Sequence, residues 1–325
     1  MYNPRTLRYQ LHDQFIKIAK RVVEADTVTE SDRLSRKYGI KGLPGLFLLG
    51  SIRFPASFPF NFMHLIFENL VPNLIRHYTG DFKGLDAGTE SYELPKCVWE
   101  AITNTTARSR DTIPSEFSAR MPDICTEQLS MTAETWSTWI TYLSPILLQE
   151  RFSKPVYYTH FTKFSHLVHL CMSYEMRRSD IELIQNRFIE WVEEYKRQVL
   201  PSLITLCILT RIYYRSFYQY DISRLSTCPF SIHALLHIAD GIESAGPVWC
   251  YWAFTMEHFC GAVGQHVKNQ QNPYASLNRR VQDLTQLQTV KLKYGLMDKL
   301  PSKRPIADGR GGGTTFKDGP CRCIE

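Results

Sequence analysis

Apolar residues recur at helical spacing along most of the chain. Leu7, Leu11 and Phe15 begin one apolar face of a helix predicted over residues 5–25, with charged residues between them. Strand patterns are scarce, and the one short candidate, residues 46–49, lies in a stretch rich in Gly and Pro. The same helical spacing predicts further helices over residues 61–77, 93–107, 132–152, 155–175, 178–196, 230–243, 248–263 and 275–292. The pattern therefore predicts a mainly α fold.

The pattern divides the chain into three parts. Residues 1–27 contain the N-terminal helix. Residues 28–295 contain the other predicted helices, beginning with a short one that Thr29 caps and Gly39 ends. Residues 296–325 are rich in Gly, Pro and basic side chains and cannot bury enough apolar surface to fold, so we expect a disordered basic tail.

Positive charge gathers near the C-terminus. Residues 266–325 contain eleven Lys or Arg and five Asp or Glu, which equals the net excess of +6 in the whole chain. Such an asymmetry is compatible with a nucleic-acid partner, here DNA, bound weakly through its phosphates and released by salt. A solvated helix face is the alternative, and the sequence leaves both open. The candidate phosphate contacts are Lys268, Arg279, Arg280, Lys291 and Lys293.

Several other classes of protein are disfavoured. The nine cysteines include no Cys-x-x-Cys pair, so neither a zinc ribbon nor a redox dithiol is indicated. The first 25 residues are charged rather than continuously apolar, and the most apolar run, near residues 199–209, is too short to cross a bilayer. No serine nucleophile elbow, kinase signature or dinucleotide fingerprint occurs. We therefore expect no membrane partner and a nuclear or cytoplasmic protein that is not secreted.

One segment carries more information than the others. Within the predicted helix that begins near residue 61, Asn61 is followed three residues later by His64. This arrangement and a series of later segments together resemble the C-terminal part of CACTA-type (En/Spm-like) DNA transposases of the fungal branch. The ordered set is more specific than any one of its members, and the similarity covers residues 28–295. The segments are residues 33–42, 57–64, 78–86, 224–229, 232–240, 246–249 and 252–261.

The resemblance implies an incomplete RNase-H-like transposase catalytic domain with a helical insertion. Such transposases use three carboxylates to hold two metal ions, Mg²⁺ in active relatives, for DNA strand cleavage and transfer. The family's second Asp aligns with Asn61 and its final Glu with Glu257, while the first Asp belongs to a segment upstream of where this chain begins. Asn61 offers one neutral oxygen, so Glu257 is the only metal ligand expected, even with His64 nearby.

We therefore expect a remnant of a CACTA-type transposase that does not cleave DNA and has no functional cofactor. The alternative is a nonenzymatic DNA- or protein-binding module derived from a transposase. In such relatives a segment like residues 191–195 leads almost directly into one like residues 217–221. Residues 197–216 are therefore interpreted as an insertion or as a translated retained intron.

Two groups of residues are left with open alternatives. Glu68 shares the predicted helix with Asn61 and faces either the site or solvent. His233 and His237, with Asp240 nearby, have the i, i+4 spacing that can present two imidazoles to zinc. Because their neighbours are apolar, a hydrogen-bonded pair that stabilises the helix is the favoured interpretation.

Overall fold

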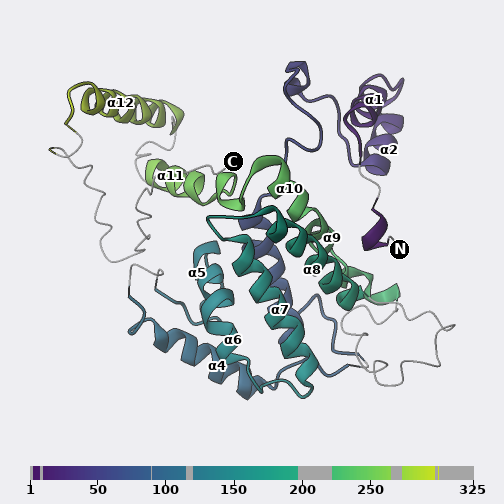
Figure 1. The fold of residues 1–325 in the computed structure, drawn as a ribbon, viewed down its shortest axis with the longest axis vertical. Coiled ribbons are helices and arrows are strands. Elements are labelled where there is room, and N and C mark those ends of the chain that lie inside the picture. Colours follow the sequence, from purple (N-terminus) through teal and green to yellow (C-terminus); the bar gives the residue numbers. More distant parts are fainter. Residues whose placement is uncertain are drawn as a thin grey trace.

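The computed structural model is a helical protein (Figure 1). It describes residues 3–7, 10–88, 90–114, 120–196, 222–264, 273–296 and 299. These ranges contain no strand, which confirms the mainly α prediction. The short strand expected at residues 46–49 is wrong, because a 3₁₀-helix, Gly45–Leu48, follows Pro44 there.

Three expectations fall wholly or mostly outside the described residues. They concern the segment 197–216, Lys268 and the tail 296–325, of which only residues 296 and 299 are described. The RNase-H-like part of the fold prediction stays a prediction.

Twelve α-helices are described, and two π-helices and several 3₁₀-helices connect or extend them. The π-helices are Met63–Leu70 and Trp139–Leu143. The α-helices are α1 (His12–Val23), α2 (Val28–Tyr38), α3 (Val71–Tyr78), α4 (Lys96–Ser109), α5 (Ala133–Thr138), α6 (Ser144–Leu147), α7 (Pro155–Cys171), α8 (Arg178–Lys196), α9 (Phe230–Ala234), α10 (Ile238–Ala245), α11 (Phe254–Gly264) and α12 (Pro273–Lys293).

Helix ends near the N-terminus follow local chemistry. The helix expected over residues 5–25 is a 3₁₀ turn, Pro4–Thr6, followed by α1. Thr27, and not Thr29, caps α2, since its hydroxyl accepts a hydrogen bond from the Glu30 amide at 3.2 Å. Gly39 ends α2 as expected, with a left-handed φ of 70° that favours glycine.

Both π-helices directly precede a proline in the next α-helix. Val71 donates its amide hydrogen to the carbonyl of Ile66, and Ser144 donates to the carbonyl of Trp139, five residues back in each case. Pro72 and Pro145 follow these two donors and have no amide hydrogen. A proline ring also clashes with the carbonyl four residues before it. The wider π turn relieves that clash without ending the helix.

The helix that runs through Met63–Leu70 and α3 is the centre of the hydrophobic core, and we call it the central helix. Phe62, Met63, Ile66 and Phe67 are at most 1% exposed. The π-helix packs against α5 and α9, and α3 continues its axis. The central helix is therefore covered on most of its circumference, and few of its side chains reach solvent.

Helices α7 and α8 form a second part of the same core. The indole nitrogen of Trp191 donates to the carbonyl of His160 at 2.9 Å, and the two rings stack with centroids 4.4 Å apart. Burial lowers the pKa of His160 to about 4, because a charged imidazole is poorly solvated there. His160 is thus a neutral packing residue.

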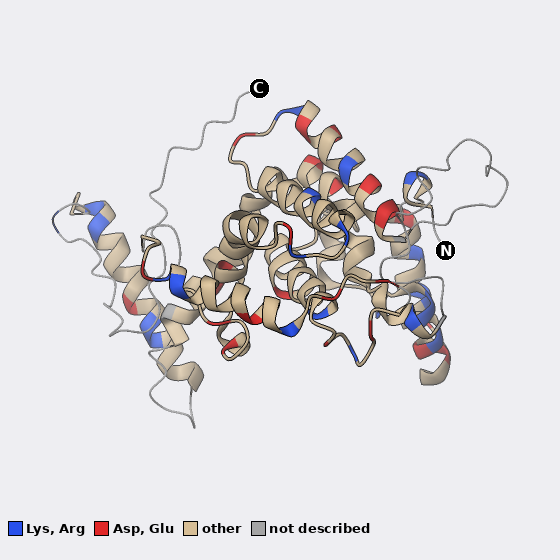
Figure 2. Ribbon diagram, turned by 90° about the horizontal axis from the view of Figure 1, so that it is seen from below, with Lys and Arg blue, Asp and Glu red and all other residues tan. Residues whose placement is uncertain are grey.

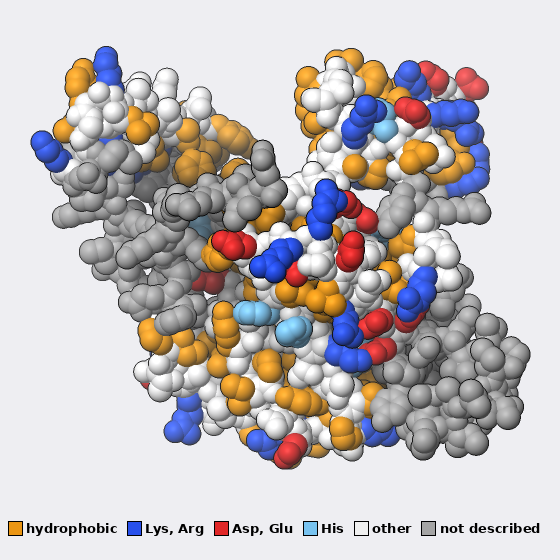
Figure 3. All heavy atoms as spheres, in the orientation of Figure 1, with side chains coloured by type: hydrophobic (Ala, Val, Ile, Leu, Met, Phe, Trp, Pro, Cys, Tyr) orange, Lys and Arg blue, Asp and Glu red, His pale blue; other side chains and the backbone are white. Residues whose placement is uncertain are grey.

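Two parts of the chain project from this body. Figure 1 shows the α1–α2 pair beyond one end of the body and α12 beyond α11 at the other, and Figure 3 shows an open notch between these projections. Lys and Arg residues lie on both projections (Figure 2). Among the described helices, none has the length and the apolar run that crossing a bilayer requires.

Candidate metal centre

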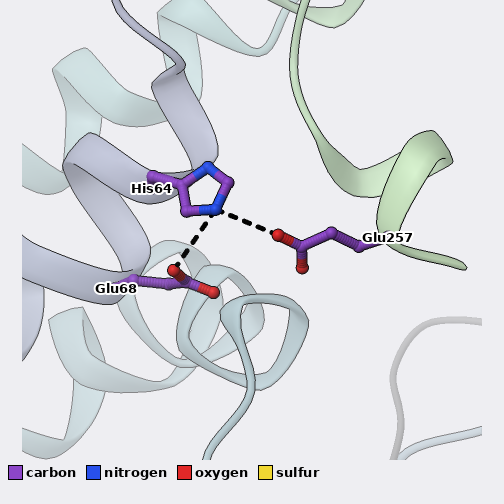
Figure 4. Close-up of side chains that lie close together, drawn as sticks. All are labelled: His64, Glu68 and Glu257. Atoms are coloured by element: carbon purple, nitrogen blue, oxygen red, sulfur yellow. Dashed lines mark ion pairs between the residues drawn. The ribbon is translucent and has the colours of Figure 1, made fainter. Parts of the chain in front are cut away.

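Two segments far apart in the sequence meet at one polar site. His64 Nε2 lies 3.0 Å from Glu257 Oε1 and 3.6 Å from Glu68 Oε2 (Figure 4). We call His64, Glu68 and Glu257 the interhelical triad. One ligand atom from each residue lies within 4.8 Å of the other two, and no other group of three or more His, Cys, Asp or Glu among the described residues does this. The triad can act as an ion-pair network or as a metal ligand set.

The central helix presents His64 and Glu68 on one of its few solvent-exposed patches. Their side chains are 45% and 39% exposed, while Leu65, Ile66 and Phe67 between them are buried. Residues four apart on a helix lie on the same face. The two polar side chains therefore point into the same space from a rigid backbone, as Figure 4 shows.

Glu257 comes from the first turn of α11, where its amide donates to the carbonyl of Ala253 at 2.8 Å. One turn earlier, the Phe254 ring lies 5.9 Å from the ring of Phe67 in the central helix. On the other side of Glu257, His258 Nε2 lies 4.0 Å from a carboxylate oxygen of Glu134 in α5. These contacts mark where the start of α11 approaches the central helix and α5.

Asn61 is the N-cap residue of the central helix. Its side-chain oxygen accepts a hydrogen bond from the His64 amide at 3.2 Å, and its carbonyl accepts one from the Leu65 amide at 2.9 Å. This is the usual role of Asn at a helix start. The amide oxygen of Asn61 is thus engaged with the backbone of the residue whose imidazole enters the triad. His64 and Glu257 lie 3.0 Å apart, and Asn61 positions His64 rather than adding a ligand to the group.

His233, His237 and Asp240 form a different group, which we call the local triad. His233 Nε2 lies 3.2 Å from His237 Nε2, and His237 Nδ1 lies 3.3 Å from Asp240 Oδ2. Both nitrogens of His237 are therefore engaged with neighbours on the same stretch of helix. This arrangement agrees with the hydrogen-bonded interpretation of the pair rather than with a zinc site.

The candidate phosphate contacts on α12 differ in exposure. Arg279 and Lys293 are exposed and Arg280 is half-buried. Lys291 is only 4% exposed, so it does not share the solvent-facing surface of the other three. The surface that can meet a phosphate backbone is therefore smaller than the sequence pattern indicates.

Glu68 is the member of the triad whose role the sequence left open. Its spacing of four residues from His64 is the only local signal that could have assigned it, and that spacing is common on solvated helices. Its place in the triad depends on Glu257 in α11, which lies 189 residues later in the chain.

No protein-family model, no curated protein and no solved structure matches the chain. The functional argument therefore depends on the resemblance in the sequence and on the geometry of the site.

Proposed function

We propose that the chain is a degenerate relative of the C-terminal part of CACTA-type DNA transposases and does not cleave DNA. The observation that supports this is the 3.0 Å contact between His64 and Glu257. The two segments of the resemblance that would carry catalytic groups lie 193 residues apart in sequence and come together in space. If the segments resembled the family only by chance, nothing would require these two to meet in the fold.

The lack of cleavage follows from the charge of the ligands. Two-metal phosphoryl transfer needs several anionic oxygens to hold two divalent ions next to a phosphate. Asn61, which aligns with the family's second Asp, contributes a neutral amide. Its oxygen already accepts a hydrogen bond from the backbone amide of His64. Glu257 and Glu68 supply two carboxylates, and both are shared with one imidazole.

The experiment is a nicking assay on supercoiled DNA with Mg²⁺ and with Mn²⁺. We expect the purified protein and its Glu257→Gln variant to show the same background. Metal-dependent nicking that disappears in Glu257→Gln would contradict the proposal. Asn61→Asp keeps the N-cap but restores only one of the three carboxylates that the resemblance requires, so we expect this variant to remain at background in the same assay.

A nonenzymatic DNA-binding role is the second candidate, and the exposed cations of α12 favour it. Arg279 and Lys293 are fourteen residues apart, close to four helical turns, so they lie near one side of α12 and about 21 Å apart along its axis. The helix projects from the body (Figures 1 and 2). Two cations so placed can contact phosphates of one duplex without reading its bases.

Salt dependence tests this candidate. Replacing both Arg279 and Lys293 with Ala should weaken DNA binding and reduce the slope of log affinity against log salt by about two. Lys96→Ala on α4, where the side chain is 91% exposed, is the matched control and should leave the slope unchanged. Equal slopes for the double variant and the unaltered protein would exclude α12 as the contact.

A further inference from the structure

We propose that the interhelical triad binds one divalent transition-metal ion, with Zn²⁺ the best match. The ligands are His64 Nε2 and one carboxylate oxygen each from Glu68 and Glu257. This inference is independent of transposase ancestry, because it concerns one ion held by an imidazole and two carboxylates. The Mg²⁺ chemistry of the resemblance requires oxygen ligands for two ions.

The distances between the ligand atoms fit a zinc coordination sphere. Zn–N and Zn–O bonds are about 2.0–2.1 Å long, so two ligands of a tetrahedral ion are separated by about 3.3 Å. The two separations from His64 Nε2, 3.0 Å to Glu257 and 3.6 Å to Glu68, lie on either side of that value. One carboxylate oxygen of Glu68 lies within 4.8 Å of one of Glu257. Because both side chains are partly exposed, they can rotate to bring these oxygens closer together.

The donor set selects the type of metal. One nitrogen and two anionic oxygens suit zinc and its neighbours in the first transition row, and three protein ligands leave a fourth position for water. Mg²⁺ prefers six oxygen ligands in an octahedron and binds imidazole poorly. The net charge of two carboxylates balances the charge of the ion.

Two of the three ligands come from a buried helix, and the third comes from α11, whose residues 255–261 are exposed. His64 and Glu68 lie on the central helix, whose flanking residues Met63 and Phe67 are fully buried. The start of α11 approaches this helix where the Phe254 ring lies 5.9 Å from that of Phe67. An ion at this point would link α11 to the central helix, so binding should stabilise the folded chain by mass action.

The alternative is an ion-pair network with no metal. An exposed pair of this kind contributes little to stability and does not respond to micromolar zinc. Calorimetric titration of the metal-free protein with Zn²⁺, together with its unfolding temperature, distinguishes the two. We expect one saturable site, a rise in the unfolding temperature and much weaker binding of Mg²⁺.

Variants locate the ion. His64→Gln and Glu68→Gln should each weaken Zn²⁺ binding at least about tenfold, since loss of an outer-shell partner alone costs that much. His237→Gln in the local triad is the matched control and should bind as the unaltered protein does. Because His64 and Glu68 are partly exposed, both variants should fold, which circular dichroism verifies.

Exposed cysteines are the competing source of a zinc signal. Cys260 lies one turn after Glu257 on α11 and is exposed. Substitution with Co²⁺ separates the cases, because a thiolate ligand gives an intense near-ultraviolet charge-transfer band and an imidazole–carboxylate set does not.

Three results would overturn the proposal: no saturable Zn²⁺ binding, binding unchanged in both His64→Gln and Glu68→Gln, or binding lost in Cys260→Ser. None of these measurements involves DNA, so failure here is distinguishable from failure of the transposase proposal.

Discussion

The interhelical triad and the local triad contain the same types of side chain, but the chain assembles them differently. The local triad lies within eight consecutive residues, and its histidines hydrogen-bond to each other at 3.2 Å. The interhelical triad joins the central helix to α11, and its one imidazole lies between two carboxylates. In the local triad, both nitrogens of His237 bind neighbouring side chains. In the interhelical triad, His64 Nε2 and two carboxylates face one point.

The comparison teaches that ligand spacing along a helix is a weak guide to a metal site. The i, i+4 histidines are the stronger zinc signal in the sequence, yet among the described residues they and Asp240 do not bring three ligand atoms together as the interhelical triad does. A site needs a further ligand from another element, so that three donors surround one volume instead of following one helix face. Glu257, at the start of α11, supplies that ligand in one triad only.

The largest effect is expected from a substitution in α10 at Gly241, the residue that follows Asp240 of the local triad. A methyl group added at Gly241 in α10 would lie 3.0 Å from Cβ of Pro59 and 3.3 Å from the hydroxyl of Tyr251. Since the ring of Pro59 cannot rotate away, the overpacking cost of about 1–3 kcal/mol should outweigh the helix-propensity gain of up to about 1 kcal/mol, so Gly241→Ala should reduce the free energy of unfolding by up to about 2 kcal/mol. Urea denaturation measures this loss.

The matched control is the same substitution in α11. Gly261 has open space around its Cβ position and lies inside the helix, so Gly261→Ala should stabilise the protein by up to about 1 kcal/mol. Opposite signs for the two variants would show that α10 is tightly packed near the local triad while this face of α11 is open. Equal losses would refute that contrast.

Much of the fold was predictable because amphipathic spacing is a local property. The helix predicted over residues 178–196 is observed as α8, Arg178–Lys196, with Ile184, Phe188 and Trp191 buried. The π-helices were not predicted. Periodicity marks a helix but does not report its hydrogen-bond register, although Pro72 and Pro145 give a signal for both.

The candidate site was predictable only in part. The resemblance named His64 and Glu257 as site residues, and in the structure these two lie 3.0 Å apart. Glu68 could not be assigned, since its helix alone does not determine what faces it. Lys291 was grouped with exposed cations although it is only 4% exposed, because a charged residue in a helical pattern does not by itself report its burial.

The smallest effect should come from the metal-free contact between His64 and Glu257. Both side chains are close to half exposed, so water and salt screen their interaction and ordering them costs entropy. A double-mutant cycle with His64→Gln and Glu257→Gln, measured in the presence of a chelator, should give a coupling energy of at most about 1 kcal/mol that decreases with added salt.

The cycle on His237 and Asp240 is the counterpart, because that pair has a similar separation of 3.3 Å. A coupling of several kcal/mol between His64 and Glu257 without metal would mean that the interhelical triad is a structural ion pair in its own right. The distinction drawn between the two triads would then disappear.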